Sequence, residues 1–424
     1  MGPAALASFS GRLILDTALT RSTAFSGSAA ETPPATSPPG AIAWAEPGRQ
    51  RAFEAWLADV APAHGLDAAS VQLASLDASF RRYFRVQSAS GQSRIIMDAP
   101  PDKEDCQPFV TVAALLKGAG LLAPDVLAWD PAAGFMLLSD LGAKTMMETI
   151  APPLAVSAIA QPTPADTALF MQAIDALIAW QLASRPGVLP PCDDALLSRE
   201  LALFPDWYVA QHRQFDLSAS QQAGLSHAFE LIKASNLQSL NGARVFVHRD
   251  FMPRNLMAPS PVAARTGLPP EGDGLPRGGP SVIPMTPSLV SPMGVLDFQD
   301  AVYGPITYDI ASLMRDAFVS WEEDFVLDIT VRYWQKARHA GLPVGDDFGE
   351  FYRAVEWMGL QRHLKILGIF ARLTLRDGKP KYLADTPRFI RYARATCARY
   401  RQLGPFMVLL DAIEGNETRV GYTF

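Results

Sequence analysis

Two polar segments of the sequence are the most informative about the fold: Val247-His248-Arg249-Asp250-Phe251-Met252-Pro253-Arg254-Asn255 and, later in the chain, Leu296-Asp297-Phe298-Gln299-Asp300. Each segment overlaps a short apolar run that predicts a buried strand; these runs are Arg244–His248 and Gly294–Phe298. Asp250 and Asn255 are five positions apart in a loop that contains a proline, so both side chains can point to one place. A lone Asp or Asn of this kind is more often a helix cap or a turn residue. The two stretches together predict a polar site built from loop residues.

The side chains of this predicted site suit magnesium and phosphate chemistry. Carboxylate and amide oxygens are hard ligands for Mg²⁺, an ion that keeps phosphate and water oxygens as its other ligands. A separate carboxylate that faces an acceptor hydroxyl can act as a general base. The residues Asp250, Asn255 and Asp297 are therefore candidates for metal ligands and for a base.

Two segments of the chain are predicted not to pack. Residues 258–293 contain nine Pro, five Gly and only four charged residues, a composition that favours irregular chain. Their flanks, Asn255–Met257 and Gly294–Phe298, both read as strands, so we expect a β-hairpin with a large insertion at its tip, where an insertion costs least. Residues 1–48, which include the Pro-rich stretch Thr32–Gly40, are expected to form a disordered extension.

Composition excludes several classes of protein. The chain has 424 residues, a formal charge of −6, 49% apolar residues and 19% charged residues. This length predicts two lobes rather than one core. The acidic balance gives no basic footprint for nucleic acid, and the apolar runs fall short of the roughly 18 residues that a membrane helix needs. Three scattered cysteines and the lack of a secretory signal predict a cytoplasmic protein with free thiols.

Apolar spacing predicts an α+β protein with a β-rich part followed by a helical part. The predicted strands are Val71–Leu76, Tyr83–Gln87, Arg94–Ala99, Phe135–Leu138 and Arg244–His248. The predicted helices are Gln50–His64, Phe109–Gly118, Phe170–Leu182, Asp194–His212, Gln221–Ser235 and Phe351–Arg376, with others after Asp309. We therefore expect a small lobe over residues 49–142 and a larger helical lobe over residues 143–424.

The motif H-R-D-x-x-x-x-N, followed by two apolar residues and D-F, resembles the catalytic loop and metal-binding strand of the protein-kinase-like fold. The resemblance is closer to the aminoglycoside phosphotransferase superfamily of small-molecule kinases. It implies a two-lobed fold that binds ATP and Mg²⁺. Only 11 residues separate Asp297 from Asp309, so there is no long activation segment, and position 252 is Met where protein kinases usually have Lys. A protein kinase is therefore disfavoured.

The resemblance also implies a role for each matched residue. Asp250 would be the catalytic base, while Asn255 and Asp297 would bind Mg²⁺. His248 would brace the loop, and Asp309, at the start of the next helix, would steady it. Arg254 would neutralise the phosphoryl group during transfer; the alternative is an ordinary surface arginine.

The nucleotide lobe departs from the family pattern. The loop before Tyr83 contains no glycine, although small residues such as Ser79 would let backbone N–H groups approach phosphate. The strand Arg94–Ala99 lacks the usual lysine. We expect Arg82 or Arg85 to replace it; the alternative is a pseudokinase that regulates without turnover. Three residues of the segment that joins the lobes would lie at the adenine: Ser139, Asp140 and Leu141.

The chain resembles one branch of the superfamily, the bacterial anomeric kinases of N-acetylmuramate and N-acetylglucosamine, over roughly Gln50–Gly404. The stretches that carry this resemblance are Asp77–Arg85, Met97–Pro101, Leu138–Gly142, His248–Met257, Gly294–Asp309 and Arg362–Arg372. The branch implies phosphorylation of the C1 hydroxyl during recycling of cell-wall sugars. Arg362 and Lys365, on one face of a predicted helix, would suit the lactyl carboxylate of N-acetylmuramate; a solvated basic stripe is the alternative. Other acceptors, such as an aminoglycoside, choline or homoserine, stay open. We expect a monomer with no nucleic-acid or membrane partner.

Overall fold

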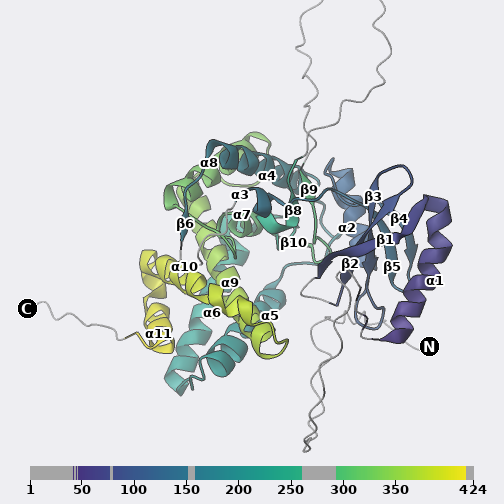
Figure 1. Cartoon of the computed structure of the whole chain (residues 1–424). Coiled ribbons are helices and arrows are strands. Elements are labelled where there is room, and N and C mark those ends of the chain that lie inside the picture. The colour runs from purple at the N-terminus through teal and green to yellow at the C-terminus, as the bar shows by residue number, and fades with distance from the viewer. Residues whose placement is uncertain are drawn as a thin grey trace, which may run out of the picture. The chain divides into compact units, whose positions relative to one another are not determined.

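The structure is a computed structural model (Figure 1) that describes residues 42, 44, 46–76, 80–150, 158–259 and 293–416. The chain divides into two compact units. The first comprises Met1–Pro108 and Asp125–Asp140, and the second comprises Phe109–Pro124 and Leu141–Phe424. Most of the predicted extension 1–48 and of the predicted insertion 258–293 lies outside the described residues.

One antiparallel sheet of five strands, in the order β1-β2-β3-β5-β4, forms the centre of the first unit. The strands are β1 (Leu66–Leu76), β2 (Arg82–Ser88), β3 (Ser93–Asp98), β4 (Val126–Asp130) and β5 (Phe135–Ser139). The strands predicted for this unit are confirmed. The sequence does not predict β4, because this edge strand is only partly buried and has no continuous apolar run.

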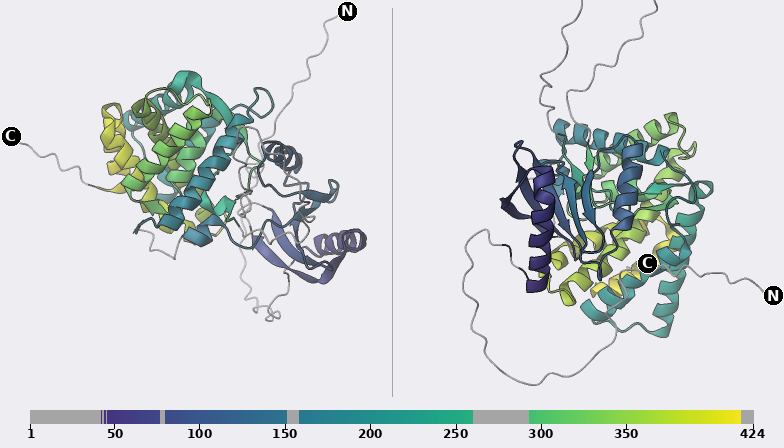
Figure 2. Two further views of the ribbon diagram at one scale, coloured as in Figure 1. Left: turned by 90° about the horizontal axis from the view of Figure 1, so that it is seen from above. Right: turned by 90° about the vertical axis from the view of Figure 1, so that its right-hand side faces the viewer.

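Helix α1 (Pro47–His64) covers one face of this sheet, as the right-hand view of Figure 2 shows. Its buried residues Phe53 and Leu57 pack on alternate residues of the strands, because successive side chains of a strand point to opposite faces. Those strand residues are Phe84, Val86, Ile96, Phe135 and Leu137. Trp44 packs against Phe53 and Phe84 with ring centroids 5.1 and 5.8 Å away. The packed chain thus begins before residue 48.

A buried ion-pair cluster fastens α1 to the sheet. The carboxylate of Asp98, which is fully buried, accepts from Arg49 Nη2 at 2.6 Å and from Arg82 Nη2 at 2.5 Å. Arg82 lies opposite Asp98 in the β2–β3 register, and its guanidinium lies 3.9 Å from the ring centroid of Trp44. One carboxylate therefore joins the helix, the sheet and the segment before the helix.

The second unit is mainly helical, which confirms the predicted α+β class with a small β-rich part and a larger helical part. Its α-helices are α2 (Gln107–Gly118), α3 (Met146–Ile150), α4 (Pro164–Leu182), α5 (Asp194–Leu203), α6 (Ala219–Gly242), α7 (Thr307–Met314), α8 (Glu323–His339), α9 (Phe348–Leu375), α10 (Thr386–Arg399) and α11 (Gly404–Glu414). The shorter turns are η1 (Phe204–His212), η2 (Pro253–Asn255), η3 (Pro380–Asp385) and η4 (Arg401–Leu403). No helix in the described part of the chain is long and apolar enough to span a membrane.

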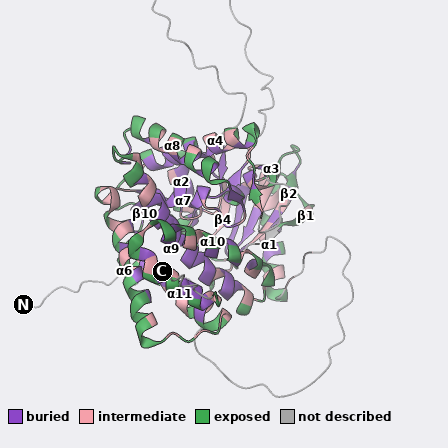
Figure 3. Cartoon of the chain, turned by 90° about the vertical axis from the view of Figure 1, so that its left-hand side faces the viewer, coloured by how far each residue is buried: buried purple, intermediate pink, exposed green. Residues whose placement is uncertain are grey.

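Helix α9 is the centre of this unit and is buried over most of its length (Figure 3). It packs against α5, α6, α7 and α10. Gly368 lets α9 approach the end of α5, because a Cβ there would lie 2.2 Å from the carbonyl oxygen of Leu203. The single helix predicted over Asp194–His212 is instead α5 followed by the π-helix η1. Pro205 lacks the N–H that an uninterrupted α-helix would use, which accounts for the change.

Short strands hold the loops of the second unit. They are β6 (Ile159–Ala160), β7 (Arg244–Val247), β8 (Leu256–Met257), β9 (Gly294–Val295), β10 (Val302–Pro305) and β11 (Ser320–Trp321). The pairs β7–β10 and β8–β9 are antiparallel, and β6–β11 is parallel. Met257 pairs with Gly294, which confirms that the two sides of the insertion form a hairpin.

The Asp98 cluster gives a prediction for stability. Asp98→Ala leaves Arg49 and Arg82 without their shared counter-charge and should lower the free energy of unfolding by about 3 kcal/mol. This value is at the lower end of the range for a broken buried ion pair, because both arginines are partly exposed. Urea unfolding measures the change. Asp328→Ala removes a carboxylate from an exposed pair with Arg332 and should leave stability unchanged. Equal losses in both variants would contradict the assigned role of Asp98.

Candidate active site

The two polar stretches singled out in the sequence meet in the second unit because backbone ladders hold them. Val247 pairs with Val302 where β7 ends, and Leu256 pairs with Val295 across the hairpin. The N–H of Leu296 then donates to the carbonyl of Asn255 at 2.9 Å. These bonds place the loop of residues 248–255 beside residues 296–300.

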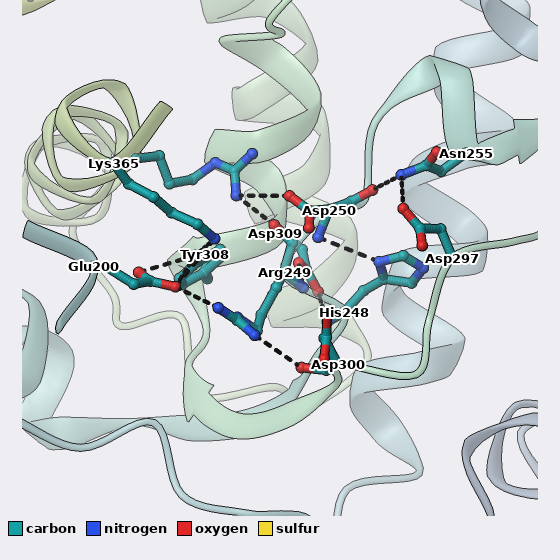
Figure 4. A network of polar contacts seen from close by, with 11 residues as sticks. Glu200, His248, Arg249, Asp250, Asn255, Asp297, Asp300, Tyr308, Asp309 and Lys365 are labelled. Carbon is teal, nitrogen blue, oxygen red and sulfur yellow. Dashed lines mark hydrogen bonds and ion pairs between the residues drawn. The ribbon is translucent and has the colours of Figure 1, made fainter. Parts of the chain in front are cut away.

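Asn255 and Asp297 lie side by side (Figure 4). The amide nitrogen of Asn255 donates to Asp297 Oδ2 at 3.3 Å and to the carbonyl of Asp250 at 2.9 Å, so its amide oxygen faces away from both acceptors. Gln299 Nε2 donates to Asp297 Oδ1 at 2.9 Å and orients the carboxylate. Asp297 has a φ of 59°, a left-handed conformation that costs a non-glycine residue free energy and is often kept at functional sites.

This pair of oxygen donors fits Mg²⁺, which takes one or two protein oxygens and fills its other positions with phosphate and water. Within the described ranges there is no group of three or more His, Cys, Asp or Glu residues that could hold a metal by itself. A metal here would therefore be held jointly by Asn255, by Asp297 and by a phosphorylated ligand.

His248 joins the loop of residues 248–255 to the neighbouring stretch of residues 296–300. Its ring is buried, and Nδ1 accepts the N–H of Asp250 at 3.3 Å. This leaves the proton on Nε2, which donates to the carbonyl of Leu296 at 2.9 Å. Burial lowers the pKa of His248 despite the nearby Asp309 and Asp250 carboxylates, so the ring is neutral and links both polar stretches.

Asp309, near the start of α7, anchors the same loop by its backbone. Its two carboxylate oxygens accept the N–H groups of His248 at 2.7 Å and of Arg249 at 2.9 Å. Arg249 has a φ of 76°, so these bonds fix a left-handed turn directly before Asp250. Burial raises the pKa of Asp309 to about 6, although His248 and the two bonded N–H groups oppose that rise.

Asp250 presents a carboxylate that is about one third exposed (36%). The guanidinium of Arg362 lies 3.7 Å from its Oδ1 and also donates to the carbonyl of Arg249. Desolvation alone would raise the pKa of Asp250, but the positive charges of Lys365, Arg362 and Arg249 lower it to about 2. Asp250 is therefore ionised at neutral pH and has one side open to a reacting group.

Behind the loop lies a buried carboxylate, Glu200, that no motif in the sequence indicates (Figure 4). Glu200 on α5 accepts from Arg249 Nη2 at 2.7 Å, from Lys365 Nζ at 3.0 Å and from the hydroxyl of Tyr308 at 3.2 Å. Burial would raise the pKa of Glu200, but Lys365 and Arg249 lower it to about 2. The arginine of the H-R-D motif, Arg249, indicates that a buried acidic partner exists. The motif does not indicate that this partner is Glu200, 49 residues earlier in the chain.

Arg362 and Lys365 do lie near the loop of residues 248–255, but not on an exposed face. Both are buried on α9, so the alternative of a solvated basic stripe is wrong for them. Their charges are matched by Asp250 and by Glu200. The predicted contact with a substrate carboxylate stays a prediction, and the observed contacts are to the loop itself.

The nucleotide residues predicted in the first unit have other observed partners. Arg82 points to the α1 side and binds Asp98, whereas Arg85 extends from the opposite face of the sheet. Arg85 Nε donates to Asp140 at 2.7 Å, and Ser139 Oγ accepts the N–H of Asp125 at 2.8 Å. Ser79 lies outside the described residues, and Leu141 belongs to the second unit.

Arg254, within η2, is exposed, and its guanidinium lies 4.9 Å from the ring centroid of Phe318. The neighbouring side chain of Asn255 faces Asp297 instead. Arg254 is therefore next to Asn255 in sequence, but its side chain extends towards Phe318 and not towards Asp297.

Two known proteins are similar in sequence to this chain over most of its length. The chain is 46% identical over 340 residues to the N-acetylmuramate/N-acetylglucosamine kinase of Pseudomonas aeruginosa, covering 80% of this chain and 87% of that one. It is 42% identical over 377 residues to the kinase of the same name from Neisseria meningitidis serogroup B, covering 89% and 99%.

Solved structures share the fold at low identity. A choline kinase from Cryptosporidium parvum Iowa II matches with a TM-score of 0.51 and 10% identity, covering 84% of this chain and 99% of that one. Amicoumacin kinase hAmiN matches with a TM-score of 0.50 and 16% identity, covering 79% and 91%. These matches confirm the predicted kinase-like fold. The family described as the phosphotransferase enzyme family matches residues 70–263 and 290–346, and the chain belongs to that family.

Proposed function

We propose that this protein is an ATP-dependent sugar kinase that phosphorylates the anomeric C1 hydroxyl of N-acetylmuramate and of N-acetylglucosamine to give the α-1-phosphates. The observation that carries the proposal is the ionised, partly exposed carboxylate of Asp250 beside the Asn255–Asp297 pair. The relatives at 46% and 42% identity, which are named for these two sugars, supply the substrate class. A role in recycling cell-wall sugars follows from that class.

In the proposed reaction the C1 oxygen forms a bond to the γ-phosphorus of ATP while the bond from that phosphorus to the ADP oxygen breaks. The hydroxyl proton passes to Asp250 and then to solvent. A carboxylate with a pKa of about 2 is a weak base, so Asp250 orients the hydroxyl and takes the proton late, once bond formation has made the hydroxyl more acidic. When bound, Mg²⁺ would neutralise charge on the phosphates, with Asn255 and Asp297 as its protein ligands.

Nucleotide use is supported by the fold neighbour hAmiN, whose structure contains AMP-PNP. Of the two arginines considered as replacements for the missing lysine, Arg85 is the better candidate because Arg82 faces α1. A pseudokinase or a kinase for another small acceptor is the competing function. We further propose a cytoplasmic monomer without nucleic-acid or membrane partners.

The first experiment measures ADP release from Mg-ATP with N-acetylmuramate, N-acetylglucosamine, kanamycin and choline. We expect turnover with the two amino sugars, a C1 phosphate by ³¹P NMR, and a loss of about 100-fold or more in Asp250→Asn. Turnover only with kanamycin or choline would reject the proposed substrate. Binding of ATP without turnover of any acceptor would favour the pseudokinase.

The pKa of Asp309 predicts opposite pH dependences of activity and stability. As the pH falls through about 6, Asp309 gains a proton, its hold on the loop weakens and kcat falls. The folded state keeps this proton above the ordinary value of 3.8, so the contribution of Asp309 to stability is present at low pH and is lost as the pH rises through about 6. Asp309→Asn should have lower kcat and no inflection near 6; an inflection unchanged in this variant would assign it to another group.

The Glu200 network predicts a coupled loss of stability and activity. Glu200→Gln leaves Arg249 and Lys365 buried without their counter-charge, which costs about 3–5 kcal/mol, and it loosens the backbone before Asp250. Denaturant unfolding and kcat measure the two effects. Asp194→Asn, on the same helix, removes a carboxylate that is mostly exposed and should have a much smaller effect. An active Glu200→Gln protein of normal stability would contradict the prediction.

A further inference from the structure

We infer that Arg254 binds the carboxylate of an acidic sugar acceptor and so sets the preference for N-acetylmuramate over N-acetylglucosamine. The inference rests on the proposed function. The two sugars differ by a lactyl ether at C3, which adds one carboxylate two ring carbons from the reacting C1. A cation that borders the catalytic loop without contacting the transferred phosphate would discriminate between them.

The direction of Arg254 separates it from the metal side of the loop. Asn255 turns its amide nitrogen towards Asp297, whereas the guanidinium of the preceding residue lies over the ring of Phe318. Phe318 follows α7 and packs against Phe370 on α9, with ring centroids 6.1 Å apart. The Arg254 side chain thus extends towards Phe318 and helix α9, although Arg254 is only four residues after Asp250 in the sequence.

The aromatic ring over which the Arg254 guanidinium lies is held in place by a buried carboxylate. Oδ1 of Asp316, a fully buried residue, accepts the N–H of Phe318 at 2.7 Å and that of Val319 at 2.8 Å, and so fixes the ring under Arg254. Oδ2 of Asp316 is buried and has no hydrogen-bond partner among the described residues. Burial raises the pKa of this carboxyl, and the two bonded N–H groups and the charges of Arg388 and Arg254 oppose the rise. A cation held over an aromatic face keeps its N–H edge available to an anion.

The other cations near the loop are already engaged. Arg249 and Lys365 bind Glu200, and Arg362 lies against Asp250 and the backbone of Arg249. All three are at least largely buried. Arg254 is exposed and, apart from the longer-range effect of its charge on Asp316, forms no ion pair with any residue that the structure describes. It is therefore the better candidate for a free carboxylate than Arg362 or Lys365.

The test compares kcat/KM for both sugars in wild type, Arg254→Gln, Arg254→Lys and Phe318→Leu. Losing a charged hydrogen bond to the carboxylate should reduce the ratio of N-acetylmuramate to N-acetylglucosamine efficiency about 10- to 100-fold in Arg254→Gln. Arg254→Lys should retain part of the preference, and Phe318→Leu should reduce it less than Arg254→Gln. The methyl ester of N-acetylmuramate, which lacks the charge, should show the same ratio to N-acetylglucosamine in wild type and in Arg254→Gln.

Two results would overturn the inference while leaving the proposed function intact. An equal loss with both sugars would mean that Arg254 acts on the transferred phosphoryl group, and an unchanged ratio with unchanged rates would make it an ordinary surface residue. Failure of the wild-type protein to phosphorylate either sugar would instead reject the proposed function and this inference with it. Thermal unfolding of each variant distinguishes a change in specificity from misfolding.

Discussion

The loop around Asp250 depends on the carboxylate of Asp309, which holds the N–H groups of two successive residues immediately before Asp250. These bonds fix a left-handed residue, Arg249, that no local sequence preference would favour. Because the backbone is fixed there, the carboxylate of Asp250 points outwards while the guanidinium of Arg249 points inwards to Glu200. The direction of the Asp250 carboxylate and the burial of the positive charge behind it are thus set by one turn.

The charged side chains around that turn interact with one another. Arg249, Arg362 and Lys365 are partly or fully buried, and they face the carboxylates of Glu200 and Asp250. The same cations that bind Glu200 keep Asp250 ionised. Helix α9 therefore helps to keep Asp250 ionised through Arg362 and Lys365, although most of its residues form the packed centre of the second unit.

The parts of the site that the sequence predicted are those fixed by short-range spacing. The motif around Asp250 and the apolar runs on either side of the insertion specify a loop and a hairpin, and both are present. Glu200 could not be predicted, since its contact with Arg249 depends on how α5 packs in three dimensions. For the same reason the helical spacing of Arg362 and Lys365 revealed a common face but not its burial.

The hairpin of β8 and β9 has a consequence for how this family can vary. Met257 and Gly294 are paired directly, so the entry and exit of the intervening chain are held together by the sheet and not by that chain. The entropy of closing a loop rises only slowly with its length. A change in the length of the intervening chain therefore costs little free energy. It also leaves the distance between Asn255 and Asp297 unchanged, so the length of this segment can vary during evolution.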